Sequence, residues 1–293
     1  MLESKNCLIT GSTSGIGKEI AIGLAKMKAN VVLVGRNKAK CQATLEEIWR
    51  NTSIDTNKNR VSYLLADLSS QASIHQLAKE FLDRYESLDI LINNAGVFLS
   101  RRFTTVDGIE YTFAVNHLAP FLLTNLLFER IKASSPSRII TTSSVAHRGA
   151  RINFDNLQFE KGRYNGVKAY RQSKLANILF TTELARRSRG SGVTSNCFHP
   201  GGVRTNLVQS SPWYYRLIWA IIDPFLVSPK KGADTALYLA SSSEVDNISG
   251  KYFVNRKPDG PSGLADDHDA AARLWKISEE LTGYNKKNNE FAS

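Results

Sequence analysis

Short apolar runs alternate with amphipathic stretches along most of this chain, and this alternation limits the folds that it can adopt. The run from Asn30 to Val34 is almost continuously apolar, as a strand covered on both faces should be. Between Ile16 and Lys28 the apolar residues recur at helical spacing. The pattern predicts an α/β fold: a single doubly wound parallel-sheet (Rossmann-type) domain over residues 1–293, with helices on both faces.

The same pattern gives the bounds of the expected elements. The expected strands are 6–10, 30–34, 61–66, 88–92, 138–142, 193–198 and 252–254. The expected helices are 16–28, 38–49, 74–85, 112–131, 167–187 and 230–239. Outside the pattern lie a polar insertion at 145–166, an irregular segment at 200–229 and a final amphipathic helix at 265–284.

Composition excludes several classes of protein. The three cysteines have no spacing typical of a disulfide framework or a zinc site, so we expect a reduced, cytoplasmic compartment and no metal. The start of the chain leaves no room for a signal peptide, and no run of about twenty apolar residues predicts a membrane span. The net charge of +11 comes from dispersed basic residues without a nucleic-acid-binding module. We therefore expect no nucleic-acid partner and attribute the charge to solubility.

A glycine-rich turn at 10–17 connects the first expected strand to the first expected helix. Glycines let the backbone turn sharply and approach a diphosphate, and the helix N-terminus adds free N–H groups and a positive dipole end. The turn predicts a dinucleotide site, with a tight turn that binds nothing as the alternative. The residues expected at the cofactor are Gly11, Ser12, Ser14, Gly15, Ile16 and Gly17.

The end of the second expected strand favours NADP over NAD. In dinucleotide-binding folds an acidic residue here hydrogen-bonds the ribose 2′-hydroxyl of NAD. This strand instead runs into Gly35 and Arg36. No carboxylate repels a 2′-phosphate there, and the planar cation of Arg36 is suited to holding one. We therefore expect NADP(H) as cofactor; an ordinary exposed arginine is the alternative.

Tyr170 and Lys174 are four residues apart on the helix expected at 167–187, so they share one face. A phenol with a pKa near 10 is a poor base at neutral pH, but a nearby cation favours the phenolate. The pair therefore predicts a proton-transfer site. On its own, such a pair is also common on solvated helices.

These motifs together resemble the short-chain dehydrogenase/reductase family, over about residues 5–255. Three residues, instead of one, separate Gly11 from Gly15, as in the family's glycine turn. Further motifs occur in the family's order, at 67–68, 93–96, 143–144, 170–174 and 200–205. Within the family, the segments 146–149, 152–154 and 173–180 are similar to the retinol dehydrogenase branch.

The resemblance implies a role for each catalytic residue. Tyr170 would exchange the proton with the substrate oxygen, and Lys174 would bind the nicotinamide ribose and lower the pKa of Tyr170. Ser144 would hydrogen-bond the reacting oxygen, with Ser143 as the rival because strand alternation turns only one of them to the cleft. Asn116 would support a water-linked proton path.

The resemblance also implies further cofactor contacts. Asp67 and Leu68 would hold the adenine, with a helix N-cap as a second role for this pair. The residues Asn94, Ala95 and Gly96 would brace the sheet and line the cleft. The contacts implied in the last loop are Pro200, Gly201 and Val203 at the nicotinamide and Thr205 at the diphosphate. His199, beside this loop, is interpreted as a loop residue and not as a base.

The function expected from these residues is an NADP-dependent oxidoreductase that moves a hydride between nicotinamide and a carbonyl or alcohol carbon. The resemblance implies a lipophilic substrate, retinoid-like or another aldehyde or ketone. A second hypothesis is a catalytically silent NADP-binding regulatory protein, although such a protein would normally have lost the tyrosine or the lysine. A nucleic-acid binder is a third, and it rests on net charge alone.

The segment 213–227 is unusually apolar, with only Arg216 and Asp223 charged. It is too short to span a bilayer, and Pro224 would interrupt a helix there. We expect a flap over the substrate cleft that selects lipophilic substrates. The alternatives are peripheral contact with a membrane surface and a subunit interface in a homodimer.

Overall fold

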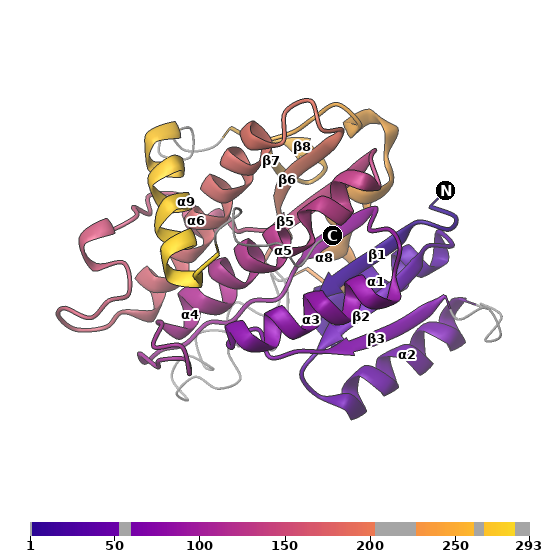
Figure 1. The fold of residues 1–293 in the computed structure, drawn as a ribbon, viewed down its shortest axis with the longest axis horizontal. Coiled ribbons are helices and arrows are strands. Elements are labelled where there is room, and N and C mark those ends of the chain that lie inside the picture. Colours follow the sequence, from indigo (N-terminus) through magenta and orange to yellow (C-terminus); the bar gives the residue numbers. More distant parts are fainter. Residues whose placement is uncertain (1, 53–59, 203–226, 261–266, 285–293) are drawn as a thin grey trace.

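The computed structural model describes residues 2–52, 60–202, 227–260 and 267–284. One eight-stranded sheet crosses this part of the chain in the order β3-β2-β1-β4-β5-β6-β7-β8, parallel throughout except for the last pair. Figure 1 shows the sheet with helices on both sides. The strands are β1 Asn6–Thr10, β2 Asn30–Gly35, β3 Val61–Leu65, β4 Ile90–Asn93, β5 Ser137–Thr142, β6 Val193–His199, β7 Tyr252–Val254 and β8 Lys257–Pro258.

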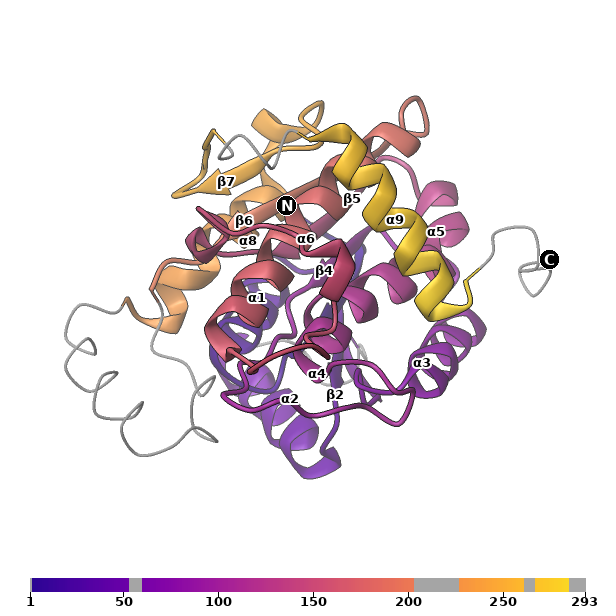
Figure 2. The same ribbon diagram turned by 90° about the vertical axis from the view of Figure 1, so that its left-hand side faces the viewer.

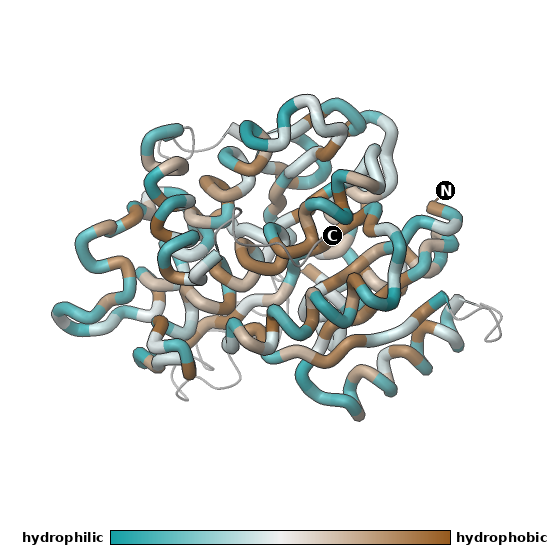
Figure 3. The backbone as a smooth tube through the Cα atoms, viewed as in Figure 1, coloured by the Kyte–Doolittle hydropathy of each residue, from teal (hydrophilic) through white to brown (hydrophobic). Residues whose placement is uncertain are grey.

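Two layers of helices cover the sheet, one on each face. Successive side chains of a strand point to opposite faces, so each strand contributes apolar contacts to both layers. Ile9 and Leu33 face α1, α2 and α8, whereas Leu8 and Val32 face α3, α5 and α6. Figure 3 shows the apolar positions gathered in the interior strands. The helices are α1 Gly15–Lys26, α2 Lys38–Thr52, α3 Gln71–Arg84, α4 Tyr111–Phe113, α5 Ala119–Ala133, α6 Gly166–Arg187, α8 Pro229–Ser241 and α9 His268–Thr282. The expected doubly wound parallel fold is confirmed.

The order of the strands reverses direction between β1 and β4, at the centre of the sheet. The chain leaves β1 toward β2 on one side and returns to β4 on the other, so Ile9 pairs with both Leu33 and Ile92. In open α/β sheets, ligands bind outside the carboxyl ends of the strands at such a switch point. The glycine turn follows β1 at this point, and the loop from Asn94 follows β4.

The helix expected at 112–131 is confirmed as one continuous helical run over 111–133, but it is not α-helical throughout. The structure has the single turn α4, then a π-helix at Ala114–Leu118, and only then α5. Asn116 lies within the π-helix, and its side chain hydrogen-bonds both the N–H and the carbonyl of Val97. Apolar periodicity cannot reveal one inserted residue in a helix, because residues on both sides of the insertion remain buried.

The C-terminal helix α9 packs on α6, on the face of the sheet that α3, α5 and α6 cover (Figure 2). The Trp275 ring lies 4.9 Å from the ring of Phe121 and 5.9 Å from that of Phe180. The expected helix at 265–284 is thus found as α9, within shorter bounds. The hairpin strand β8 was not expected, because it has only two residues and follows a turn in which Asn255 and Arg256 both have positive φ.

No helix within the described ranges is long and apolar enough to cross a membrane. In the same ranges, no group of three or more His, Cys, Asp or Glu side chains is arranged to hold a metal ion.

Candidate active site

The ends of β1 and β4 are locked together by a small hydrogen-bond network. The Thr10 hydroxyl accepts hydrogen bonds from the main-chain N–H groups of Asn94, at 3.0 Å, and Ala95, at 3.1 Å. The Asn94 side-chain amide donates to the carbonyls of Thr10 and Gly11, at 3.0 and 3.3 Å. Sequence reasoning placed Asn94 at the cleft but missed the contribution of Thr10, whose only signal was its place before Gly11.

Glycine is required in the turn by its close contacts. Gly11 has φ of +64°, and a Cβ there would lie 2.8 Å from the Ala95 Cα. A Cβ on Gly17 would lie 2.3 Å from the Gly11 carbonyl oxygen and 2.4 Å from the Asn94 side-chain nitrogen. Both distances are shorter than any real contact, so the first turn of α1 approaches the sheet only because a side chain is absent.

The N-terminus of α1 is open to an anion. Its N-cap residue Ser14 makes no side-chain hydrogen bond to the first turn. By contrast, the helices α3, α6 and α9 are capped by the side chains of Ser70, Asn165 and Asp267. Free N–H groups at the positive end of a helix dipole suit a diphosphate. The α1 terminus therefore fits the cofactor group that the sequence predicted.

Ser12 is oriented differently from the other residues of the turn. It is fully buried, and its hydroxyl accepts a hydrogen bond from the Val34 N–H at 3.0 Å. The side chain thus joins the start of the turn to β2 and faces the sheet. The main-chain N–H of Ser12 also donates to the Val34 carbonyl oxygen, at 3.4 Å, so this residue braces the turn against β2.

Arg36 lies exposed directly after β2, beside the glycine turn. The Thr13 methyl group lies 2.7 Å from where a Cβ on Gly35 would be, so the turn packs against the end of this strand. The Arg36 guanidinium donates a hydrogen bond to the Tyr111 hydroxyl at 3.3 Å. A cation therefore stands near the turn, where an NAD-binding fold would place a carboxylate.

Asp67 and Leu68 follow β3 at the same edge of the sheet. Asp67 is exposed, and its carboxylate accepts hydrogen bonds from the N–H and the hydroxyl of Ser69, at 3.0 and 2.8 Å. The N-cap of α3 is Ser70, so the second role considered for Asp67 is wrong: the carboxylate closes a turn one step before the helix. Leu68 is half-buried against the core between α3 and α5.

Ser144, Tyr170 and Lys174 come together from β5 and α6. The Ser144 side chain faces the Tyr170 phenol closely enough to lower the pKa of that phenol. The Lys174 ammonium nitrogen lies 5.6 Å from the centroid of the Tyr170 ring. The Phe98 ring packs edge-on against Tyr170, with the centroids 5.9 Å apart. Phe98 had no sequence signal, because it is one apolar residue in an irregular loop.

The two neighbouring serines face different environments. Ser143 is fully buried, and its hydroxyl donates to the Lys174 carbonyl oxygen at 2.8 Å. Ser144 is half-buried, and its hydroxyl oxygen accepts a hydrogen bond from the Ala146 N–H at 3.1 Å while it faces Tyr170. The alternation of the strand thus turns Ser144, and not Ser143, toward the phenol.

Lys174 and Asn116 meet on either side of the loop after β4. A Cβ on Gly96 would lie 3.4 Å from the Asn116 side-chain oxygen and 3.5 Å from the Lys174 nitrogen. Lys174 donates to the Thr142 carbonyl at 3.1 Å, and the Asn116 amide donates to the Ser173 hydroxyl at 2.9 Å. The segment 94–96 therefore connects the glycine turn at one end to Lys174 at the other.

The protein side chains alone do not make Tyr170 acidic. Burial raises the pKa of Tyr170 to about 12, and the Ser144 side chain opposes this rise. Burial also lowers the pKa of Lys174 to about 8, so most of its amine still carries a charge at pH 7. The lowering of the phenol pKa by Lys174 stays a prediction; among the groups described, burial raises the pKa of Tyr170 and only Ser144 lowers it.

The loop after β6 is described only at its start. Gly201 has φ of +89°, and a Cβ there would lie 3.0 Å from a methyl group of Val227, so these two described residues lie close together. Pro200 and Gly201 thus follow β6 at the carboxyl edge, as expected. The residues Val203 and Thr205 and nearly all of the proposed flap lie outside the described residues. His199 is the last residue of β6 instead of a loop residue, and burial lowers its pKa to about 4.

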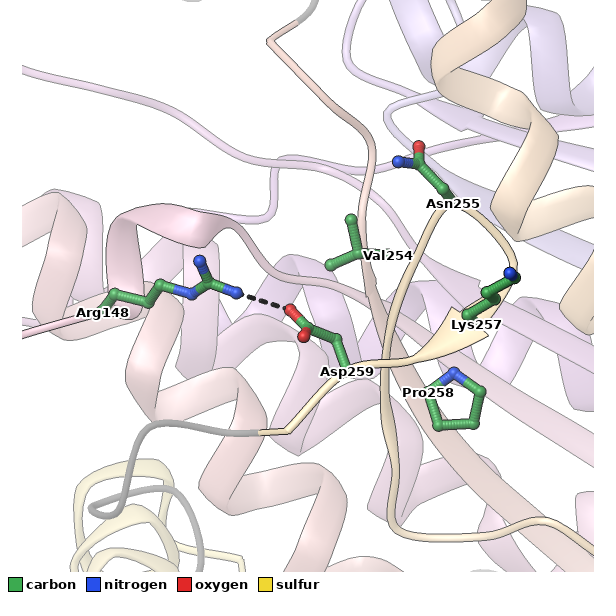
Figure 4. Close-up of a pocket in the computed structure, with 6 residues that line it drawn as sticks. All are labelled: Arg148, Val254, Asn255, Lys257, Pro258 and Asp259. Atoms are coloured by element: carbon green, nitrogen blue, oxygen red, sulfur yellow. Dashed lines mark hydrogen bonds and ion pairs between the residues drawn. The ribbon is translucent and has the colours of Figure 1, made fainter.

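A cavity of about 540 Å³ lies between Arg148 and the β7–β8 hairpin. Figure 4 shows Arg148 reaching across to Asp259, whose carboxylate it meets at 2.7 Å. Arg148 follows the 3-10 turn Val145–His147, whose N-cap is Ser144. The remaining lining residues are Val254, Asn255, Lys257 and Pro258.

Comparison of the sequence and of the structure with known proteins finds dehydrogenases in both cases. A family model described as short chain dehydrogenase matches residues 5–213. Human retinol dehydrogenase 13 is 42% identical over 287 residues, which cover 96% of this chain and 86% of that protein. A putative uncharacterized protein from Mycobacterium paratuberculosis is similar in structure, with a TM-score of 0.77, 34% identity, and coverage of 97% of this chain and 96% of that chain. The Pseudomonas aeruginosa RhlG/NADP active-site complex has a TM-score of 0.68 and 25% identity, over 86% of this chain and 94% of that chain.

Proposed function

Because this chain belongs to the short chain dehydrogenase family, we propose that it uses NADP(H) to interconvert an alcohol and a carbonyl group on a lipophilic substrate. Family membership and the retinol dehydrogenase relatives establish the coarser activity, an NAD(P)-dependent oxidoreductase. The observation that carries the finer proposal is the convergence of Ser144, Tyr170 and Lys174 at one end of the segment 94–96, whose other end contacts the glycine turn.

The residues present fit a dinucleotide phosphate. The uncapped N-terminus of α1 would hold the diphosphate, and the close approach of Gly17 to Gly11 keeps that terminus beside the sheet. Arg36 would pair with a 2′-phosphate, since no carboxylate stands at the end of β2. Support for NADP also comes from the relative whose structure is an NADP complex. The other proposed contacts are Asp67, Leu68, Pro200, Val203 and Thr205.

When bound, the nicotinamide would supply or accept the hydride at the substrate carbon. The protein would handle the proton. Tyr170 would donate it to the carbonyl oxygen while Ser144 hydrogen-bonds the same oxygen and stabilises its developing charge. A pKa of about 12 keeps the proton on the phenol at neutral pH. The protein side chains alone therefore keep Tyr170 protonated, and the protonated phenol is the form that can donate a proton to a carbonyl oxygen.

Lys174 and Asn116 would support this proton transfer. Lys174 is fixed by the Thr142 carbonyl and would bind the nicotinamide ribose. Asn116 is held by its two hydrogen bonds to Val97, so the π-helix fixes its position next to Ser173. A water chain that starts at this amide would return the proton to Tyr170 from solvent.

The surroundings of the proton-transfer residues favour a lipophilic substrate. Phe98 contacts the Tyr170 ring, and two exposed valines flank the catalytic pair: Val145 follows Ser144, and Val167 lies one helical turn before Tyr170. Apolar side chains at these positions offer no hydrogen bonds to a polar ligand. They would contact the hydrocarbon part of an aldehyde, ketone or alcohol. The relatives named retinol dehydrogenases are consistent with such a substrate.

The test is a measurement of kcat/KM for NADPH and NADH with a panel of aldehydes and ketones that runs from propanal to retinal. We expect NADPH to be preferred and kcat/KM to rise with the length of the apolar chain. Arg36→Asp should reverse or abolish the preference for NADPH, because it replaces a phosphate-pairing cation by a repelling carboxylate. The matched control is Lys132→Asp, an exposed cation at the end of α5.

Two outcomes would count against the proposal. A wild-type enzyme that prefers NADH would show that Arg36 does not select the cofactor. Tight NADPH binding without turnover on any carbonyl would favour the silent regulatory protein instead.

A further inference from the structure

Two surface loops that are distant in sequence pack against each other at one end of the molecule, at the left of Figure 1. Arg102 donates a hydrogen bond to the Gln158 carbonyl at 3.0 Å, and the Gln158 side chain accepts one from the Glu110 N–H at 3.1 Å. A Cβ on Gly166 would lie 2.1 Å from the Leu99 carbonyl oxygen, so the two backbones touch there. We call the exposed side chains of the segments 99–107 and 159–168 the rim surface.

The rim surface carries large apolar side chains that face solvent. Phe103 is 55% exposed, Val106 is 87% exposed and Val167 is 43% exposed. Within the described ranges only two other large hydrophobic side chains are exposed, Leu65 and Val145, and both are less exposed than these three. Single exposed apolar residues are ordinary, but three gathered on two packed loops suggest a contact surface.

The same surface is basic. Arg101, Lys161, Arg163 and Lys168 are all exposed, and none forms an ion pair with another described residue. Both acidic groups of the surface are engaged: Glu160 lies 3.9 Å from Arg102, and the Asp107 carboxylate accepts a hydrogen bond from the Gln71 N–H. The rim surface therefore presents unpaired positive charge around its apolar residues.

A buried carboxylate holds the rim surface in shape. Glu110 is fully buried and accepts hydrogen bonds from the Thr112 and Phe113 N–H groups, at 2.9 and 2.6 Å. Tyr164 donates its hydroxyl proton to the same carboxylate at 2.9 Å. The loops are thus tied to α4 from within, and the apolar side chains face outward from a fixed scaffold.

From these features we infer that the rim surface docks on an anionic lipid bilayer. Apolar side chains surrounded by lysine and arginine match an interface where hydrocarbon lies beneath negatively charged headgroups. A second copy of this chain fits less well, because a two-fold contact would bring the same unpaired cations together. Nucleic acid would neutralise the cations but offers no hydrocarbon to the aliphatic Val106.

Docking here would place the membrane beside the proton-transfer residues. Val167 is on the same face of α6 as Tyr170, three residues away, and Phe98 directly precedes the rim surface and contacts the Tyr170 ring. The inference goes beyond the proposed function and does not depend on it, because it concerns where the protein resides and not which reaction it catalyses. It also assigns membrane contact to a surface other than the segment 213–227.

The test is co-sedimentation of the full chain with vesicles of phosphatidylcholine alone and of phosphatidylcholine with roughly one-third phosphatidylserine. We expect binding to the anionic vesicles that weakens as salt is raised. A basic side chain near an anionic surface strengthens partitioning roughly fivefold. The triple variant Arg101→Glu, Lys161→Glu, Arg163→Glu should therefore bind at least about a hundredfold more weakly.

A matched control separates this surface from net charge. Lys132→Glu, Lys251→Glu, Lys276→Glu changes the net charge equally at exposed positions elsewhere and should bind nearly as the wild type does. The double variant Phe103→Ser, Val106→Ser should weaken binding at least about tenfold with all charges retained. Thermal unfolding of each variant shows that it is folded.

Several results would overturn the inference. One is equal loss of binding in the rim and control triple variants, which would mean that only net charge matters. Another is a wild-type protein that does not bind anionic vesicles. A wild-type protein that forms dimers, when the rim variants are monomers, would also overturn it. A third is normal binding by both rim variants together with its loss in Leu217→Ser, Ile218→Ser, Ile222→Ser, which would assign the contact to the segment 213–227.

Discussion

Replacing each of the two neighbouring serines by alanine tests the active-site geometry. Ser144→Ala removes the hydroxyl that faces the Tyr170 phenol, whereas Ser143→Ala removes a buried hydroxyl that bonds the Lys174 carbonyl. The two substitutions are chemically identical and one position apart. They should nevertheless affect different quantities, because one group faces the substrate and the other faces α6.

The expected magnitudes follow from the role of each hydroxyl. Loss of one hydrogen-bond donor to a developing oxyanion lowers kcat about 100- to 1,000-fold, so Ser144→Ala should lose at least about 100-fold at nearly unchanged stability. Ser143→Ala should lose a buried hydrogen bond worth about 1 kcal/mol of unfolding free energy. For a chain of this size, that lowers Tm by about 2 °C. Its kcat should stay within about threefold of the wild type.

The assay is NADPH oxidation with one carbonyl substrate at saturation, together with urea and thermal unfolding of both variants. The reasoning is refuted if Ser143→Ala loses about 100-fold or more in kcat while Ser144→Ala remains active. Equal losses in both variants would also refute it, because the structure gives the two hydroxyls no shared partner.

Two further predictions concern stability. Gly17→Ala should lower the unfolding free energy by about 2 kcal/mol or more and weaken NADPH binding, because its Cβ would lie 2.3 Å from the Gly11 carbonyl oxygen. The control Gly260→Ala, whose Cβ would meet nothing within 4 Å, should be neutral. Equal Tm values in the two variants would contradict the prediction. Burial also keeps three histidines neutral by lowering their pKa below the unfolded value near 6.5, to about 3 for His117 and about 4 for His199, with His147 shifted in the same direction. Below pH 6.5 the unfolded chain takes up protons that the folded protein does not, so urea unfolding should show full stability above that pH. For His117 and His199 the expected loss is up to about 1.4 kcal/mol per pH unit for each histidine toward pH 4.5. Stability that is level from pH 7 to pH 5 would count against this prediction.

The strands could be predicted closely from the sequence because burial on both faces leaves a simple signal. The central residues 31–34 of β2 are all apolar, and residues 139–142 of β5 are all β-branched, so each strand can be placed from its own sequence. The glycine turn and the Tyr170–Lys174 pair could also be predicted, since each depends on spacing within one segment. Their convergence in space then follows from the parallel order of the strands.

Features that depend on contacts between segments could not be predicted. The π-helix at Asn116 is fixed by hydrogen bonds to Val97, nineteen residues earlier in the chain. The resemblance favoured Ser144 over Ser143, but the buried partner of Ser143 depends on the position of α6, and the pKa of Tyr170 depends on the burial of its phenol. Periodicity carries none of this information, because it describes one element at a time.

The central claim is that Tyr170 transfers the proton in an NADPH-dependent reaction, and Tyr170→Phe tests it most directly. The measurement is the rate of NADPH oxidation with a carbonyl substrate, beside the dissociation constant of NADPH from fluorescence titration. The account predicts a loss of at least about a hundredfold in kcat with the NADPH dissociation constant nearly unchanged, since the ring remains. The control is Tyr238→Phe on α8, which removes a hydroxyl that hydrogen-bonds the Glu244 carboxylate. This variant should leave both quantities unchanged. Turnover by Tyr170→Phe at the wild-type rate would contradict the account.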